Sequence, residues 1–453
     1  MRLATKTNLQ WNPQVVSVSL NDNASCVSTG SQRGFRICQL VPSFKRHPFG
    51  LKGGIGICEM LGCSSLVAIV GGGDSPAFSS RRLRIFNTTT STAICEMNFD
   101  YPIVAVRLNT KCLTVVLPLS IHIYNIDTMK KTQVLDTPSN PGGLCTLQTV
   151  VGLPSPSPTT SSSSASSASS ASSASSASSA SSVLLCFPGS SDKGDVVVFN
   201  VAAQKVLGVI EAHQSPLAAL VLSPGGRYLA TASVKGTLIR VFDVSQTQAL
   251  LNGTTKEQIV ATFRRGVTSS VVTTMRFNAN SSLLCCGSKN GTVHVFDVNA
   301  VVDPEHSVSI QASKSAAAAN TSTASTAIAA SKSLFSGLIE TLPTAISSHR
   351  SVCSVAVGAE VASFVCGFVS MSSDGGGGGG GGGGGSGGEV KTDKKGVDSS
   401  SSKEDCIVVV TSTGIVSIYS MDFISGTTVL QNQHLLVENA KQQESSITEG
   451  TIK

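Results

Sequence analysis

The chain has few charged residues and almost no tryptophan. Only 13% of its 453 residues are Asp, Glu, Lys or Arg, and Trp11 is the single tryptophan. Lys and Arg outnumber Asp and Glu by 33 to 27, an excess too small to indicate nucleic-acid binding but compatible with an anionic membrane surface. No apolar secretory segment follows Met1, and the longest weakly polar run, 352–371, is interrupted by Glu360. That run therefore fits strands better than a membrane span.

Signals for catalysis or metal binding are also absent. The thirteen cysteines include no Cys-x-x-Cys pair and lie mostly in apolar runs, which predicts buried thiols in a reducing compartment. The histidines are dispersed, no carboxylate pair stands out, and there is no Gly-x-x-x-x-Gly-Lys-Ser/Thr phosphate loop. A Gly-x-Ser-x-Gly match at 384–388 lies inside a glycine tract with no strand before it. We expect a protein that is not an enzyme and carries no metal or cofactor.

A five-residue phrase recurs along the chain. It alternates apolar residues, carries Phe or Tyr at its fourth position in most copies, and often follows a Gly-containing turn. The seven copies are Phe35–Gln39, Leu83–Asn87, Ile121–Asn125, Val196–Asn200, Ile239–Asp243, Val293–Asp297 and Val416–Ser420. Intervals of roughly forty residues, with other apolar runs between the copies, are typical of propeller blades with four short strands each. The phrase has Phe/Tyr-Asp/Asn where the WD repeat has Trp-Asp, so the sequence predicts an all-β, seven-bladed propeller of WD-repeat type over residues 8–437.

Low-complexity segments explain the longer intervals between copies. A Ser/Ala-rich insert is predicted at 154–182, an insert in the sixth blade at 299–350, a Gly-rich insert at 372–404 and a tail at 438–453. Such sequences bury too little apolar surface to offset the entropy lost on ordering, so we expect all of them to be disordered. One short helix near 332–343 is the exception considered below.

Two consecutive arginines, Arg264 and Arg265, follow an apolar run at Ile259–Ala261. If residues 259–265 form a strand, neighbouring side chains point to opposite faces, and the two guanidinium groups serve two separate sites. Each guanidinium is a planar fork of N–H donors suited to phosphate. The alternative is a pair of solvated surface arginines.

Longer segments around this pair resemble the PROPPIN family of phosphoinositide-binding propellers, which includes the WIPI proteins. The resemblance is carried by Ala212–Ala219, Leu229–Phe242, Phe263-Arg-Arg-Gly266 and Gly291–Phe296, with Gly53–Leu61 and Ala68–Gly73 similar to the family's second blade. It implies two rim sites, in the fifth and sixth blades, for the headgroups of phosphatidylinositol 3-phosphate and phosphatidylinositol 3,5-bisphosphate.

Matching positions assign residues to each site. The first site would use Arg264 with His213, Ser215, Ser233, Lys235, Thr237 and Arg240. The second would use Arg265 with Thr268, Ser269, Ser288, Thr292 and His294. Hydroxyls, an ammonium group and guanidinium forks together suit a dianionic phosphate. Arg240 can equally be a solvated strand residue, and His294 a histidine satisfied within the blade.

A short amphipathic segment lies in the predicted insert of the sixth blade. Residues 332–343 place five apolar side chains at helical spacing on one face: Leu334, Phe335, Leu338, Ile339 and Leu342. Such a face can lie in a bilayer interface or pack back on the propeller. The family resemblance implies a membrane-inserting loop at this position.

These observations predict a monomeric cytoplasmic propeller that binds membranes peripherally and does not bind nucleic acid. The resemblance implies a scaffold on preautophagosomal, endosomal or vacuolar membranes, where it recruits autophagy lipid-transfer or conjugation proteins to the forming autophagosome. The alternative is a protein-interaction propeller whose basic groove binds an acidic peptide without lipid specificity.

Overall fold

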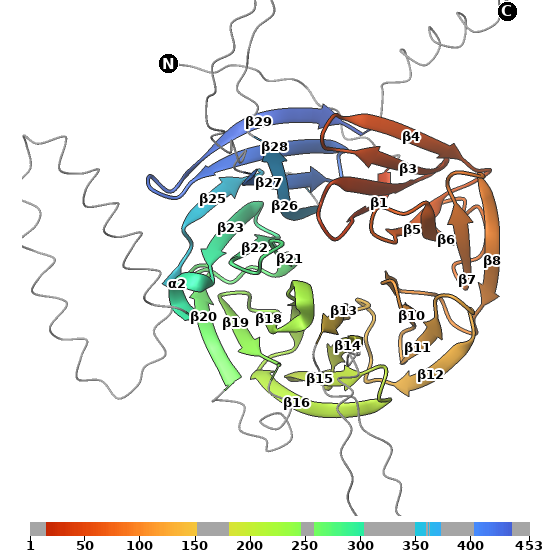
Figure 1. Cartoon of the computed structure of the whole chain (residues 1–453), viewed down its shortest axis with the longest axis horizontal. Helices are drawn as coiled ribbons and strands as arrows, with labels where there is room; N and C mark the ends of the chain where they lie inside the picture. Colours follow the sequence, from red (N-terminus) through yellow and green to blue (C-terminus); the bar gives the residue numbers. More distant parts are fainter. Residues whose placement is uncertain are drawn as a thin grey trace, which may run out of the picture.

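The strands form a ring of seven sheets (Figure 1). The structure, a computed structural model, describes residues 15–151, 181–245, 258–302, 349–358, 361, 363–372 and 403–436. Within these residues, the four main strands of each sheet are antiparallel neighbours in chain order. The first strand of each sheet lies nearest the centre of the ring (Figure 1). This is the predicted seven-bladed propeller.

The four main strands of each blade follow one another in the chain. Blade 1 has β1 (Val15–Leu20), β2 (Cys26–Ser31), β3 (Gly34–Gln39) and β4 (Lys45–Gly50). Blade 2 has β5 (Ile55–Met60), β6 (Leu66–Gly71), β7 (Arg82–Asn87) and β8 (Thr92–Asn98). Blade 3 has β9 (Ala105–Leu108), β10 (Cys112–Val116), β11 (Ser120–Asn125) and β12 (Lys131–Asp136). Blade 4 has β13 (Thr146–Val151), β14 (Ser181–Pro188), β15 (Gly194–Asn200) and β16 (Lys205–His213).

The remaining blades carry the candidate site. Blade 5 has β17 (Leu217–Leu222), β18 (Tyr228–Ser233), β19 (Leu238–Asp243) and β20 (Ile259–Arg264), extended by the short parallel strand β24 (His349–Arg350). Blade 6 has β21 (Val272–Phe277), β22 (Leu283–Ser288), β23 (Thr292–Asp297) and β25 (Cys353–Ala356). Blade 7 has β26 (Phe364–Ser372), β27 (Lys403–Thr411), β28 (Ile415–Asp422) and β29 (Thr427–Leu435). Among the described residues there are also two short helical turns, η1 (Pro224–Gly226) and α2 (Asn299–Val302).

The recurring phrase forms the third strand of every blade. Its alternating apolar residues are buried, as in β19, where Ile239, Val241 and Phe242 are fully buried. Seven apolar clusters make up the core, and each one joins two neighbouring blades. At the junction of blades 5 and 6 the rings of Phe263 and Phe296 stack with centroids 4.8 Å apart. A blade is therefore stabilised mainly by its neighbours, because each sheet buries both faces against them.

Within the described residues, the first and last blades meet at the closure of the ring without sharing a strand. The apolar cluster at this joint includes Leu20 and Val27 of blade 1 and Val408 of blade 7. Arg276 of β21 adds a polar link, because it donates hydrogen bonds to the carbonyls of Leu20 and Asn21, both at 2.6 Å. Charged donors make such hydrogen bonds stronger than neutral ones.

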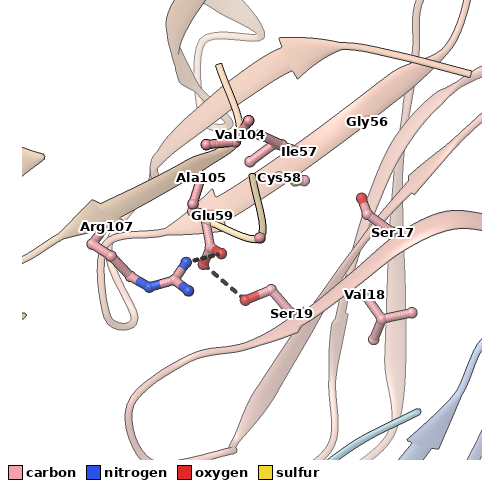
Figure 2. Close-up of a pocket in the computed structure, with 11 residues that line it drawn as sticks. Ser17, Val18, Ser19, Gly56, Ile57, Cys58, Glu59, Val104, Ala105 and Arg107 are labelled. Atoms are coloured by element: carbon pink, nitrogen blue, oxygen red, sulfur yellow. Dashed lines mark hydrogen bonds and ion pairs between the residues drawn. The ribbon is translucent and has the colours of Figure 1, made fainter. Parts of the chain in front are cut away.

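A second polar link joins the inner strands of blades 1, 2 and 3. Glu59 of β5 accepts a hydrogen bond from the hydroxyl of Ser19 at 2.8 Å and forms an ion pair with Arg107 at 3.0 Å. Figure 2 shows the carboxylate between these two side chains at a hollow of about 160 Å³. The inner strands are thus tied by charge as well as by apolar packing.

The predicted inserts fall largely outside the described residues, as does the 332–343 helix with Leu334, Phe335, Leu338, Ile339 and Leu342. At their borders, two hairpins extend further than composition suggests. Ser181 pairs with Val151 and Lys403 pairs with Ser372, so β14 and β27 begin inside the predicted inserts. Backbone hydrogen bonding can continue a hairpin where side chains give no strand signal.

Candidate functional site

The two arginines lie where β20 ends, between blades 5 and 6. The strand ends at Arg264, one residue earlier than expected, and Arg265 begins the following loop. Arg264 is exposed and pairs in register with Leu238 of β19 on one side and with Arg350 of β24 on the other. Phe263 packs into the apolar cluster shared with blade 6. Because side chains alternate along a strand, Arg264 lies on the opposite face, the one turned towards blade 4.

His213 and Arg240 meet on that face. The Nε2 atom of His213, at the end of β16, lies 2.9 Å from the hydroxyl of Thr231. Arg240 donates a hydrogen bond to the carbonyl of Ala212. Burial, reinforced by the charge of Arg240, lowers the pKa of His213 to about 4. The imidazole is therefore neutral at pH 7, and Arg240 is held at the junction of blades 4 and 5 rather than extending into solvent.

The other predicted residues of the first site cluster around the turn from β18 to β19. Ser233 is buried at the end of β18, Lys235 is exposed in the turn, and Thr237 follows Gly236. Gly236 has a φ of 60°, a left-handed conformation that favours glycine. Ser215 lies in the loop after β16, and Leu217 just beyond it pairs with Ser233. The chain thus brings the predicted first-site residues to one corner of blade 5.

Arg265 points the other way, towards blade 6, and only 6% of it is exposed. Its Nε donates to the carbonyl of Gly236 at 2.5 Å, and one terminal nitrogen donates to the carbonyl of Thr268 at 2.5 Å. The other terminal nitrogen lies 3.4 Å from the hydroxyl of Ser288. Burial lowers the pKa of Arg265 from its ordinary value, which still leaves the group charged at neutral pH.

A chain of polar contacts continues from Arg265 across blade 6. Ser288 and Thr292 both donate to the side-chain carbonyl of Asn290, at 2.7 and 2.9 Å. The ring of His294 lies 3.3 Å from the hydroxyl of Thr292 and 3.3 Å from that of Ser351. Burial, with a further contribution from Arg265, lowers the pKa of His294. Ser269, also predicted for the second site, contacts blade 5 instead: its hydroxyl donates a hydrogen bond to the carbonyl of Lys235 at 3.0 Å.

The segments that carry these residues have few acidic side chains, and Glu211, Asp243 and Asp297 lie near the ends of β16, β19 and β23. No Asp or Glu occurs in 212–242 or in 258–296, whereas Lys235, Arg240, Arg264, Arg265 and Lys289 lie within these ranges. The local potential is therefore positive, which favours an anionic ligand. Within the described residues there is no cluster of three or more metal-ligating side chains, and no helix is long and apolar enough to cross a membrane.

Four polar residues of the site are absent from the sequence-based assignment. Thr231 contacts His213, Asn290 orients Ser288 and Thr292, Ser351 contacts His294, and Arg350 pairs in register with Arg264. Asn290 could have been found from its Asn-Gly turn, which brings the side chain back over the adjacent hydroxyls. Arg350 and Ser351 carry no such signal, because they follow the long insert of the sixth blade.

The candidate site is separate from the hollows at the inner strands. Those have volumes of about 160 and 550 Å³ and are lined by residues such as Glu59, Arg107 and Arg276. None of the predicted headgroup residues lines either of them. The candidate site lies at strand ends outside both hollows, which fits a ligand displayed on a surface better than an enclosed small molecule.

The profile of the PROPPIN family matches residues 14–154 and 163–355. The chain belongs to the PROPPIN family. It is similar to Autophagy-related protein 18 of Yarrowia lipolytica, with 36% identity over 299 residues, covering 63% of this chain and 66% of that protein. The corresponding protein of Dictyostelium discoideum is 33% identical over 295 residues, covering 64% of this chain and 67% of that protein. The chain spans half to two thirds of the length of the first matched relatives.

Solved PROPPIN propellers have the same fold. Kluyveromyces lactis Hsv2 superposes with a TM-score of 0.56 at 18% identity, covering 94% of this chain and 99% of that one. A complex of KlAtg21 with the coiled coil of AgAtg16 gives a TM-score of 0.57 at 21% identity, covering 94% of this chain and all of the other. The solved structures thus show the fold of this PROPPIN, and the sequence matches show that its relatives are autophagy-related proteins.

Proposed function

We propose that this PROPPIN is a non-catalytic membrane scaffold that binds phosphatidylinositol 3-phosphate and phosphatidylinositol 3,5-bisphosphate through the two corners around Arg264 and Arg265. The observation that carries the proposal is the divergence of these consecutive arginines, one towards blade 4 and one towards blade 6, in segments 212–242 and 258–296 that contain no Asp or Glu. A phosphate dianion needs several N–H and O–H donors, and both corners supply guanidinium and hydroxyl groups.

The position of the corners sets the geometry of docking. Both lie on the outer rim at the junction of neighbouring blades, so the disc stands edge-on to a membrane. Two modest sites on one rigid body act through effective concentration, and their combined avidity exceeds that of either alone. The apolar residues of 332–343 would add insertion into the bilayer interface.

The wider role follows from kinship. We infer that the membrane-bound propeller recruits autophagy proteins, of the lipid-transfer or conjugation machinery, to the forming autophagosome. The matched relatives named Autophagy-related protein 18 and the solved complex of a related propeller with a coiled coil support this part of the proposal. We expect the protein to be distributed between the cytoplasm and preautophagosomal, endosomal or vacuolar membranes.

Liposome flotation tests the lipid part. Vesicles of phosphatidylcholine alone, or with phosphatidylinositol 3-phosphate or the 3,5-bisphosphate, are mixed with wild type and with the R264T/R265T variant. We expect binding only to the 3-phosphorylated lipids, and a loss of about tenfold or more in the variant, because each lost charged hydrogen bond is worth roughly 1.5–3 kcal/mol.

The control is R81T/R82T, which removes another consecutive arginine pair, on blade 2, far from the candidate site. It changes net charge equally and should bind normally. Equal binding of R264T/R265T and wild type would refute the site assignment. Binding that is independent of lipid type, or a preference for an acidic peptide over vesicles, would favour the protein-interaction alternative.

Replacing Phe335 and Leu338 by Asp should weaken retention of the protein on vesicles and leave binding of the soluble headgroup intact.

A further inference from the structure

The two arginines of the motif are not equally available. The guanidinium of Arg264 is exposed and makes no hydrogen bond or ion pair with the rest of the described chain. The guanidinium of Arg265, by contrast, donates hydrogen bonds to Gly236, Thr268 and Ser288. The guanidinium N–H groups of Arg265 already donate to acceptors of the protein. A phosphate that binds this guanidinium must therefore displace one or more of those acceptors. The second corner is therefore closed in this structure, and the first is open.

Residues 266–271, here called the capping segment, close the second corner. The carbonyl of Thr268 accepts from Arg265, while the Ser270 amide donates to the carbonyl of Lys235 at 3.2 Å. On the side of blade 6, the amide of Asn290 donates to the hydroxyl of Ser270 at 3.1 Å, and the amide of Lys289 donates to the carbonyl of Val271 at 2.9 Å. The capping segment is thus held between the turns of two blades, and Ser270 contacts both.

The start of the capping segment is loosely packed. Val267 is 83% exposed, and a Cβ atom added at Gly266 would meet nothing within 4 Å. Gly266 does not have the positive φ that favours glycine either. Neither steric space nor backbone conformation requires glycine here in the closed arrangement. A glycine that the closed state does not need is well placed to act as a pivot between two backbone conformations.

We propose that Ser270 is a positioning residue that holds the capping segment over Arg265. The second corner opens when the segment pivots at Gly266, and an anionic headgroup then replaces the Thr268 carbonyl on the guanidinium. This inference rests on the proposed function. It means that headgroups bind at the first corner before they bind at the second. Arg264 binds its headgroup directly, whereas Arg265 binds only after the cost of breaking the Ser270 contacts has been met.

The test uses the full chain and soluble D-myo-inositol 1,3-bisphosphate, the headgroup of phosphatidylinositol 3-phosphate. R264A isolates the second corner. In that background S270A should bind the headgroup about fivefold more tightly, because loss of one hydrogen bond of about 1 kcal/mol favours the open state. G266A should bind more weakly with the fold unchanged. S191A, which changes an exposed serine in the turn between β14 and β15, outside both corners, is the matched control and should have no effect. Hydrogen exchange of 266–271 and 288–291, measured across the titration, gives the affinity and the loop state together.

The outcomes separate the inference from the function on which it rests. Tighter binding by S270A, with faster exchange of the Ser270 and Asn290 amides on adding headgroup, supports the capping segment. Equal or weaker binding by S270A, or protection of these amides by headgroup, overturns it even if wild type binds through Arg264. No binding by wild type at any headgroup concentration overturns the proposed function, and the capping role with it.

Discussion

His213 is buried at the junction of blades 4 and 5, and its environment makes stability depend on pH. Its pKa is lowered to about 4 by burial and by the charge of Arg240, whereas an unfolded histidine titrates near 6.5. The unfolded chain therefore binds a proton between pH 6.5 and 4 that the folded chain does not bind. Stability linked to His213 is fully present above pH 6.5 and is lost as the pH falls through this window.

We expect the change from pH 7.5 to pH 5 to cost wild type about 2 kcal/mol of unfolding free energy through this one residue. H213N, which keeps a polar group near Thr231 but does not titrate, should lose correspondingly less over the same interval. Urea denaturation at the two pH values measures the difference. H47N, at an exposed position on β4, is the control and should follow wild type. An identical pH dependence in wild type and H213N would show that the imidazole is not neutral in the fold.

At the scale of elements, the turn from β18 to β19 connects the two corners. Its Lys235 side chain belongs to the predicted first site, while its backbone carbonyls hold Ser269, Ser270 and Arg265. Gly236 permits this arrangement, because a Cβ atom there would lie 1.9 Å from the carbonyl oxygen of Ser270. The turn and the capping segment can approach so closely only if the residue is glycine.

Replacing Gly236 by alanine should therefore force the turn and the capping segment apart. We expect G236A to lose about 2–4 kcal/mol of unfolding free energy, from left-handed strain plus the displaced hydrogen bonds, and to bind headgroup more weakly at both corners. G225A is the matched control, since Gly225 also has a positive φ, of 78°, but nothing lies within 4 Å of its added Cβ. It should lose only about 1–2 kcal/mol and bind normally. Chemical denaturation and headgroup titration of both variants decide the matter; equal losses would mean that the close approach at Gly236 is unimportant.

The same elements show what sequence can and cannot predict. The third strand of each blade was predictable because alternation of apolar residues is local, and Ile239–Asp243 coincides with a complete strand. The side-chain directions of Arg264 and Arg265 followed from the same alternation. The engagement of Arg265 by Gly236 and Thr268 did not, since it depends on how closely two blades approach. The pairing of Arg350 with Arg264 was hidden for another reason: three strands of blade 6 and most of the predicted insert at 299–350 lie between the two residues, so no local pattern relates them.

At the scale of the whole molecule, the ring depends on the joint between blade 1 and blade 7. Every blade is complete in itself, and no strand of one end is hydrogen-bonded into the sheet of the other among the described residues. Within the described residues this is also the joint that no continuous stretch of chain crosses, so we expect the ring to open most easily here. Arg276 matters here because it reaches from blade 6 to the inner strand of blade 1, past blade 7. Its pKa is lowered by burial, partly offset by Asp22 and Glu59.

We expect R276M to keep much of the apolar contact of the stem and to leave the Leu20 and Asn21 carbonyls without their charged donor. The cost should be about 2–4 kcal/mol of unfolding free energy, because buried acceptors that lose a partner pay their desolvation. R227M is the control: Arg227 is 61% exposed and pairs with Asp243 at 3.3 Å, and such surface pairs contribute about 1 kcal/mol or less. Hydrogen exchange should rise first in β1 and β26 of R276M, before the remaining blades, if the joint is the weak point of the ring. Uniform exchange across all seven blades, or equal stability of R276M and R227M, would instead place the cohesion of the ring in its apolar clusters alone.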